Sequence, residues 1–172
     1  MPELLLHFSI PFAVAKTKYN LKQTTIIATA ALTPDIDALL HIHRSITHSI
    51  IITTITTIPI ALLTYKKKPK YLTLLIACYL AITSHILLDT FQTYTPTLYP
   101  ITENSIWIKA EGNIIISNTI TPKITTTIQT TQTNFTTFQT LDAPIYTSQG
   151  LITSILLTII PTILTRKKII TA

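Results

Sequence analysis

The sequence has little of three kinds of residue, and each shortage excludes a class of protein. A single cysteine among 172 residues excludes an intramolecular disulfide framework and a cysteine-rich zinc module. Two glycines, with neither a GxGxxG nor a GxxxxGK[ST] pattern, argue against a glycine-rich phosphate loop. Charged residues make up 12%, against roughly 25% in an ordinary soluble domain, whereas hydrophobic residues make up 47%. The class that remains is a small membrane protein of one domain.

The cations are grouped beside apolar segments rather than spread over a surface. Their groups are Lys16–Lys22, Lys66–Lys70 and Arg166–Lys168, and the net charge is +6. Cytoplasmic loops of membrane proteins carry such an excess of Lys and Arg. No basic stretch is interleaved with aromatic residues, so we expect no nucleic-acid partner.

Several segments are uncharged, or nearly so, over a length close to that of a membrane span. A bilayer crossing needs about 20 residues. Two segments are close to that length, Ile46–Thr64 and Tyr71–Phe91. Leu151–Thr165 is shorter, and Leu4–Ala15 and Thr24–Leu32 are shorter still. We therefore expect an all-α integral bundle of about four to five membrane helices in the cytoplasmic membrane.

The positive-inside rule gives one consistent orientation for these segments. The amino end lies outside, the first two basic groups lie inside, and a long segment from Gln92 to Gln149 lies outside. No cation precedes Leu4–Ala15, so we expect this stretch to stay as a helix rather than to be cleaved as a signal peptide. The expected regions are a helical metal-site core at 1–91, an external segment at 92–150 and a C-terminal membrane helix with a basic tail at 151–172.

The external segment is expected to be rich in β-structure and threonine. Ser105–Ala110 and Ile114–Ile116 flank Glu111-Gly112-Asn113, which predicts a β-hairpin that turns at these three residues. Residues 119–140 alternate threonine with isoleucine. They form either a further strand or a flexible stalk.

The ionisable residues that suggest chemistry gather in the first half of the chain. An ionisable side chain inside a membrane segment is costly and is therefore a functional candidate. The histidines are His7, His41, His43, His48 and His85, and the carboxylates among them are Asp35, Asp37 and Asp89.

Two of these groups have a spacing that favours metal binding. His85 and Asp89 are four residues apart, so a helix presents both on one face, where they can share a divalent ion. A structural polar pair that faces the bundle interior is an equal alternative. Thr33 and Pro34 fit the N-cap and first position of a helix, so Asp35 and Asp37 fall in its first turn. They either complement the helix dipole or act as metal ligands, and we favour ligands.

Residues 41–49 form the densest polar segment. His41 and His48 share a face only if one helix continues through both, and His43 then points elsewhere. Arg44 suits a phosphate or a carboxylate, because its planar fork makes bidentate bonds. The alternative is an interfacial segment whose His and Arg side chains reach water.

Depth along the predicted helices tests whether these groups can meet. At 1.5 Å per residue, His48 lies about 27 Å from Lys66 and His85 about 22 Å from Lys70. Asp35 and Asp89 come to a similar level, and His7 is the least deep. Four segments thus bring ionisable groups to the outer half of the membrane.

Taken in order, these residues resemble the YdjM-like membrane-bound metal-dependent hydrolases. The family pattern stands here as His7, then Pro34-Asp35-Ile36-Asp37, then His43-Arg44-Ser45-Ile46-Thr47-His48-Ser49, then His85-Ile86-Leu87-Leu88-Asp89. Thr93–Pro100 resembles the loop that follows, except that Thr95 stands where family members usually carry glycine. The resemblance covers residues 1 to about 108.

The resemblance implies a metal-dependent hydrolase with its metal site toward the outer face. Its ligands are drawn from His7, Asp35, Asp37, His43, His48, His85 and Asp89, and we expect zinc, with manganese or iron as alternatives. A more distant similarity to zinc phospholipase C and P1-type nucleases implies a phosphate ester as substrate, such as a membrane lipid headgroup. Arg44 would then hold the phosphate, and Asp37 or Asp35 would act as general base.

Two other functions use the same residues. A metal or proton transporter predicts polar groups spread through the membrane depth, and the sequence places them at one end instead. A non-catalytic protein with a structural metal site or a partner-binding role predicts that substitutions lower stability without abolishing any turnover.

Overall fold

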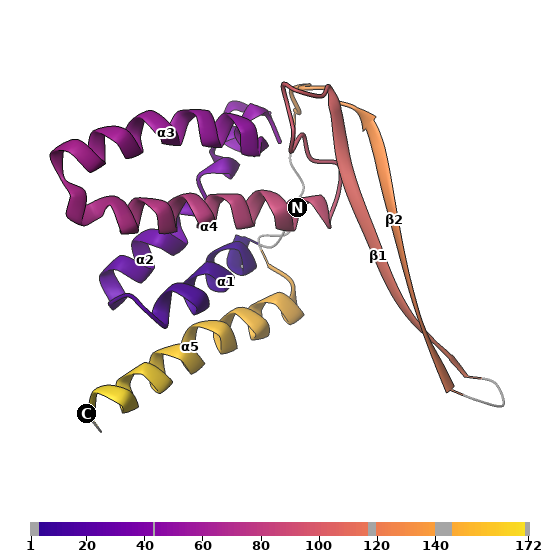
Figure 1. Ribbon diagram of the computed structural model, residues 1–172. Coiled ribbons are helices and arrows are strands. Elements are labelled where there is room, and N and C mark those ends of the chain that lie inside the picture. Colours follow the sequence, from indigo (N-terminus) through magenta and orange to yellow (C-terminus); the bar gives the residue numbers. More distant parts are fainter. Residues whose placement is uncertain (1–3, 43, 117–119, 140–145, 171–172) are drawn as a thin grey trace.

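The computed structural model describes residues 4–42, 44–116, 120–139 and 146–170, and these form a mostly helical protein with one small sheet (Figure 1). Its α-helices are α1 (Leu4–Lys16), α2 (Leu21–Ala30), α3 (Ile50–Lys67), α4 (Leu72–Thr90) and α5 (Ser148–Ile170). Its 3-10 helices are η1 (Pro34–Leu40), η2 (Ile46–His48) and η3 (Pro69–Tyr71). Its strands are β1 (Asn104–Ile116) and β2 (Ile120–Gln132), which pair antiparallel.

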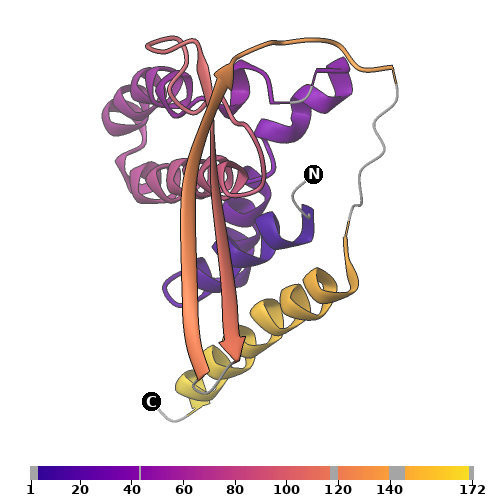
Figure 2. The same cartoon turned by 90° about the vertical axis from the view of Figure 1, so that its right-hand side faces the viewer.

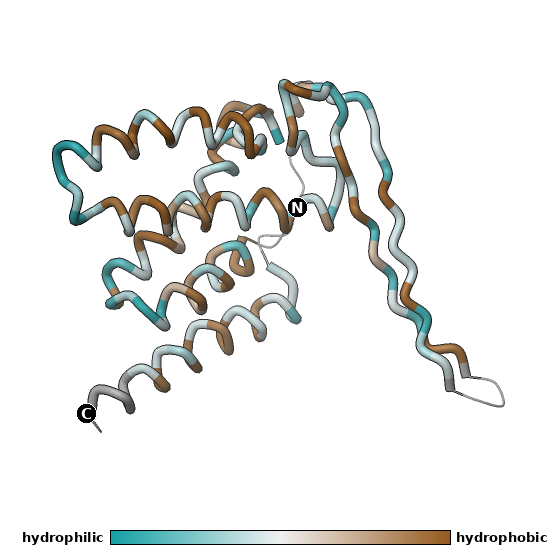
Figure 3. The backbone as a smooth tube through the Cα atoms, viewed as in Figure 1, coloured by the Kyte–Doolittle hydropathy of each residue, from teal (hydrophilic) through white to brown (hydrophobic). Residues whose placement is uncertain are grey.

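Three helical segments are long and apolar enough to cross a membrane. They are Ile50–Lys67, Pro69–Thr90 and Ser148–Thr165. All three expose large aliphatic side chains. Hydrophobic residues recur along α3, α4 and α5, as the colouring of Figure 3 shows. Helices α1 and α2 have 13 and 10 residues, so the expected number of four to five membrane helices stays a prediction.

Threonine-rich helices can lie in an apolar environment here because their hydroxyl groups bond to their own backbone. Thr54 Oγ1 donates to Ile50 O at 2.7 Å, and Thr158 Oγ1 donates to Ser154 O at 2.9 Å. Each hydroxyl thereby has an acceptor within its own helix, and Thr54 Oγ1 also lies 2.8 Å from Tyr79 Oη of α4. Helices α3 and α5 each contain an internal proline, Pro59 and Pro161. Membrane helices tolerate internal prolines.

The helices pack so that both described basic loops lie at one end and the polar segments at the other. Helix α1 packs on α2 and α5, and α4 packs on α2 and α3. Lys16–Lys22 and Lys66–Lys70 lie at the end opposite η1, η2 and the last turn of α4 (Figure 1). The packing core uses small residues, among them Ala15, Ala31 and Ala81.

The hairpin differs from its prediction, because its turn does not lie at Glu111-Gly112-Asn113. These residues are in the middle of β1 and pair with residues 125, 124 and 123 of β2. No glycine among the described residues has a positive φ, so Gly112 supplies none of the left-handed backbone that a tight turn uses. The β-branched residues of 120–132 form the partner strand, which decides between the two alternatives for this stretch in favour of a strand.

The hairpin and the segment after it are attached to the polar end of the bundle (Figure 2). Thr95 and Ile106 exchange two backbone hydrogen bonds of 2.9 Å, which tie the loop after α4 to β1. Beyond β2 the chain passes over this end of the molecule, where Phe138 N donates to His41 O at 2.9 Å. We call residues 133–139 the strap, because they pair with residues 41–42 through this bond and the bridge between Thr137 and Ile42.

Residue 95 needs no glycine in this chain. Thr95 is fully buried, and its Oγ1 donates to Thr93 O at 3.2 Å. Positive φ angles occur among the described non-glycine residues only at His41 and Arg44. Thr95 is therefore accommodated without left-handed backbone.

Candidate metal centre

Three chain segments bring four ligand side chains to one point. His85 and Asp89 lie one turn apart near the end of α4, and both are 0% exposed. Asp35 comes from the first turn of η1 and His48 from η2. One donor atom from each of the four lies within 4.8 Å of the others, so these residues could hold a metal ion.

The distances between these donors fit a tetrahedral site. His48 Nε2 lies 3.5 Å from Asp35 Oδ1 and 3.3 Å from Asp89 Oδ2. His85 Nε2 lies 3.5 Å and 3.8 Å from the same two oxygens. Zinc bonds of about 2.0–2.1 Å place neighbouring tetrahedral donors about 3.3 Å apart. The four donor–donor distances given above are close to that value. Little movement is therefore needed for all four donors to bind one ion.

The charges of the cluster favour a divalent cation. Asp35, Asp37 and Asp89 are offset by Arg44 alone when the histidines are neutral, which leaves two negative charges. Burial opposes a charge on His48, but the carboxylates of Asp35, Asp37 and Asp89 outweigh it and raise the pKa of His48 to about 10. Burial likewise opposes a charge on Asp35, yet the imidazoles of His48 and His85 hold its pKa below the usual range. The cluster thus attracts a proton or a metal ion.

Several buried polar atoms of the cluster have no hydrogen-bond partner among the described residues. They are both ring nitrogens of His7 and His85 and one oxygen each of Asp35 and Asp89. Buried polar groups left unpaired are expensive, which makes an ion that ligates some of them the simplest explanation. Two imidazoles and two carboxylates without thiolate suit zinc, manganese or iron, so the donor set fits the expected class of metal.

Asp37 contacts the back of His48 rather than the centre of the cluster. Its Oδ2 accepts from Ser45 N at 2.7 Å and lies 3.0 Å from Thr47 Oγ1 and 3.3 Å from His48 Nδ1. A carboxylate on the far nitrogen of a ligating histidine fixes its tautomer and ring orientation. Asp37 therefore holds Nε2 of His48 toward Asp35 and Asp89.

His7 lies at the rim of the cluster and is 1% exposed. Its Nε2 is 3.3 Å from Asp89 Oδ1, the oxygen opposite the one that faces His48 and His85. Its ring packs on that of His85 with centroids 3.9 Å apart. His7 contacts the four-residue group without being one of its members.

Arg44 lies beside the cluster, and only part of its guanidinium group has a hydrogen-bond partner among the described residues. Its φ of 56° is in the left-handed region, which non-glycine residues rarely adopt. Its Nε donates to Asp89 Oδ2 at 3.1 Å, while its Nη2 is buried without a hydrogen-bond partner among the described residues. The unpaired Nη2 can donate a hydrogen bond to an anionic oxygen that also reaches the metal centre.

The remaining histidines of the predicted site are placed differently. The backbone is left-handed at His41, so no single helix runs through residues 41–48, and the ring of His41 packs instead on Phe138 at 5.7 Å. His43 lies outside the described residues.

The start of η1 at Pro34 agrees with the prediction, but the predicted N-cap does not form. Thr33 Oγ1 donates back to Ala30 O and makes no side-chain cap.

Thr47 has a role that the sequence reasoning missed. Its Oγ1 lies 3.0 Å from Pro34 O and from Asp37 Oδ2, and 3.2 Å from His48 Nδ1. It therefore links η1, Asp37 and His48. The available signal was its place directly before His48 in the quoted motif.

The comparison with protein families covers nearly the whole chain. The model described as YdjM inner membrane protein matches residues 5–167, so it runs beyond residue 108 through the hairpin and most of α5. No curated protein and no solved structure matches the chain significantly. The chain belongs to the YdjM inner membrane protein family, and with its three apolar helices this suggests a membrane protein.

Proposed function

We propose that this member of the YdjM inner membrane protein family is a metal-dependent hydrolase of phosphate esters, acting at the membrane. The observation that carries the proposal is the position of Arg44. An unpaired Nη2 lies beside a four-donor metal cluster, so a buried anion can contact both. Zinc is the metal that the donor set and distances favour most.

The residues have separable roles in such a reaction. Asp35, His48, His85 and Asp89 would hold the divalent ion, which supplies a Lewis acid and lowers the pKa of a bound water. Arg44 would bind a phosphoryl oxygen through Nη2 and keep Asp89 in place through Nε. Asp37 orients His48, a role that its three contacts favour over that of general base.

A lipid phosphate is the substrate class that the surroundings favour. The ligand residues lie at the end of the apolar helices, where a bilayer has its headgroups. The strap and the loop after α4 pack at this end, and the donor groups are at most 9% exposed. By the positive-inside rule, the proposed orientation places the metal centre toward the outer face, away from the basic loops.

Full burial also favours a second candidate, a structural metal site. Structural sites use four protein ligands and no open position, whereas catalytic ones keep a position for water or substrate. The four described donors fill a tetrahedron if all of them bind. Hydrolysis therefore requires one of these ligands to be replaced or the coordination to expand.

Metal content and turnover together test the proposal. We expect about one zinc per chain in the purified protein, lost in the H85A/D89A double variant, with the H41A variant as a matched histidine control. A metal-loaded protein that releases phosphate from phosphatidic acid in vesicles supports hydrolysis. A protein that binds metal and shows a lower unfolding temperature without it, yet hydrolyses no phosphate ester, would identify the metal as structural.

A further inference from the structure

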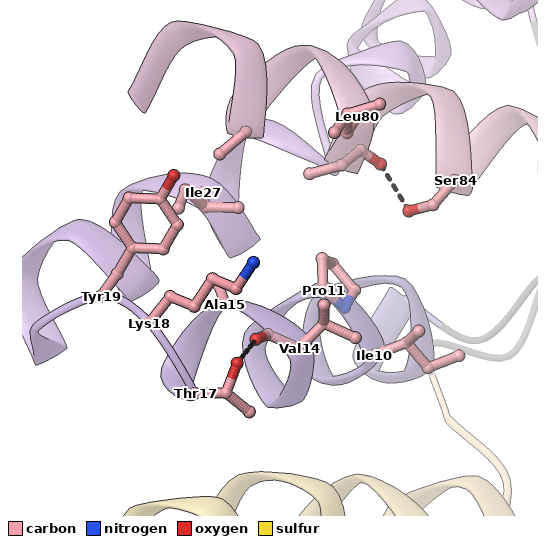
Figure 4. Close-up of a pocket in the computed structure, with 12 residues that line it drawn as sticks. Ile10, Pro11, Val14, Ala15, Thr17, Lys18, Tyr19, Ile27, Leu80 and Ser84 are labelled. Atoms are coloured by element: carbon pink, nitrogen blue, oxygen red, sulfur yellow. Dashed lines mark hydrogen bonds between the residues drawn. The ribbon is translucent and has the colours of Figure 1, made fainter. Parts of the chain in front are cut away.

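A groove lies between α1 and α4, one turn below the metal centre, and has a volume of about 300 Å³ (Figure 4). Ala15, Ala77 and Ala81 line it together with Ile27 of α2. Small side chains at these positions leave the space between the two helices. Most of the lining is apolar, and its polar residues are Thr17, Lys18, Tyr19 and Ser84.

The groove leads to the cluster along both helices. His7 is one turn before Pro11 on α1, and His85 is one turn after Ala81 on α4. Residues four apart share a helix face, so the two histidines continue the faces that line the groove. Their ring centroids lie 3.9 Å apart, just beyond the end of the groove where Ser84 contributes to the lining.

The open side of the groove faces the membrane. Val14 of α1 and Leu80 of α4 stand on opposite rims and are 70% and 59% exposed (Figure 4). Leu80 belongs to the Pro69–Thr90 membrane segment, so what surrounds this surface is lipid hydrocarbon rather than water. Lys18 and Tyr19 bound the far end, toward the basic loops.

We propose that this groove binds one hydrocarbon chain of a lipid phosphate ester while its phosphorylated headgroup lies at Arg44 and the metal centre. This inference rests on the proposed function and specifies its substrate as a lipid that enters sideways from the bilayer. Lateral entry agrees with the burial of the donor side chains, which are at most 9% exposed. A hydrocarbon chain in the groove makes dispersion contacts with the apolar side chains that line it.

Photo-crosslinking tests the groove independently of turnover. The probe is phosphatidic acid with a diazirine in one acyl chain, in phosphatidylcholine vesicles that contain the zinc-loaded full chain. We expect peptides with Val14 and Leu80 to be labelled several-fold more than those with Ile58, which is 53% exposed on α3. Removal of zinc should reduce this excess, because the headgroup loses its anchor.

Groove-filling variants give the matched comparison. A81F should lower the labelling of Val14 and Leu80 to the level of α3 with zinc content unchanged, whereas I58F on α3 should leave it unchanged. V14W provides a second filling variant at an exposed position, should A81F not fold. Equal labelling of α1, α4 and α3 in a zinc-bound wild type overturns the groove and leaves the metal centre intact. A labelled groove in a chain that binds no zinc overturns the headgroup position and the proposed hydrolase.

Discussion

Oδ2 of Asp37 lies 3.3 Å from Nδ1 of His48, on the side of the ring turned away from Asp35 and Asp89. The pair is fully buried apart from 2% of Asp37. Because a carboxylate can only accept, it favours the neutral His48 tautomer that carries its proton on Nδ1, in which the Nε2 lone pair is directed toward Asp35 and Asp89. The relation between these two residues decides whether His48 is available as a ligand.

Replacing Asp37 by asparagine should therefore weaken metal binding without removing the ligands. The amide can donate to Nδ1 and leave the proton on Nε2, where it blocks the metal. Loss of such a partner typically costs about 10–100-fold in metal affinity. Competition with a chromogenic chelator measures the affinity, and E111Q, an exposed carboxylate of β1, is the control. An unchanged affinity in D37N would show that Asp37 does not position His48.

Metal binding should release a proton at neutral pH. The pKa of His48 is raised to about 10 in the metal-free cluster, so its imidazole is protonated at pH 7 and must lose that proton to bind an ion. The apparent zinc affinity should rise as pH rises and fall as pH falls, by about tenfold per unit for one displaced proton. Calorimetry in buffers of different ionisation enthalpy counts the protons. A pH-independent affinity between pH 6 and 8 contradicts a protonated His48.

The raised pKa of His48 makes the metal-free fold less stable as pH rises, whereas metal binding becomes stronger. A proton bound more tightly when folded stabilises the folded state, fully so below the unfolded pKa of about 6.5. This contribution is lost as pH rises through the folded value of about 10. The unfolding temperature of the zinc-free protein in detergent should accordingly fall from pH 6.5 to 10, while zinc should remove most of that slope.

Replacing Arg44 by lysine should separate anion binding from metal binding. A lysine keeps the charge but has no fork to contact Asp89 and an anion at once. Hydrogen bonds to charged groups contribute about 1.5–3 kcal/mol, so affinity for inorganic phosphate should fall by roughly 10–100-fold with zinc still bound. Calorimetry on the zinc-loaded protein measures this, with K109Q on the hairpin as control. Equal phosphate affinity in R44K and wild type excludes Arg44 from anion binding.

Replacing Thr95 by the glycine usual in the family should destabilise this chain. Thr95 is buried and has no left-handed backbone, so glycine gains nothing and adds freedom to the unfolded state. The expected loss is about 0.5–1 kcal/mol in the free energy of unfolding, with zinc content unchanged. T95S keeps the backbone restriction and the hydroxyl bond to Thr93, so denaturant titration should show a smaller loss for it. A more stable T95G would contradict this assignment.

The cluster could be anticipated from the sequence because it depends on regular geometry. His85 and Asp89 share a face of α4 by helical spacing, and helical rise places Asp35 and His48 at a similar depth. The structure brings these four residues together. The ligand roles of His7, Asp37 and His43 stay predictions. Depth in the membrane alone does not distinguish a metal ligand from a residue that orients a ligand.

Other features depend on contacts that spacing does not encode. Asp37 reaches Ser45 N and His48 because the backbone turns at His41 and Arg44, and two positive φ angles at non-glycine residues have no clear sequence signal. The hairpin turn was misplaced because Gly112 looked like a turn residue. Pairing over the whole length of β1 and β2 outweighs that local preference.

The cluster also sets an order on the assembly of the protein. Asp35 and His48 are made before His85 and Asp89, and both earlier residues sit on short 3-10 helices that have little stability alone. A metal ion that needs all four donors could bind only after α4 has been made and packed beside α3. Metal capture would then be a late event in biogenesis, and a bound ion would report that the two helices on either side of the Lys66–Lys70 loop have paired.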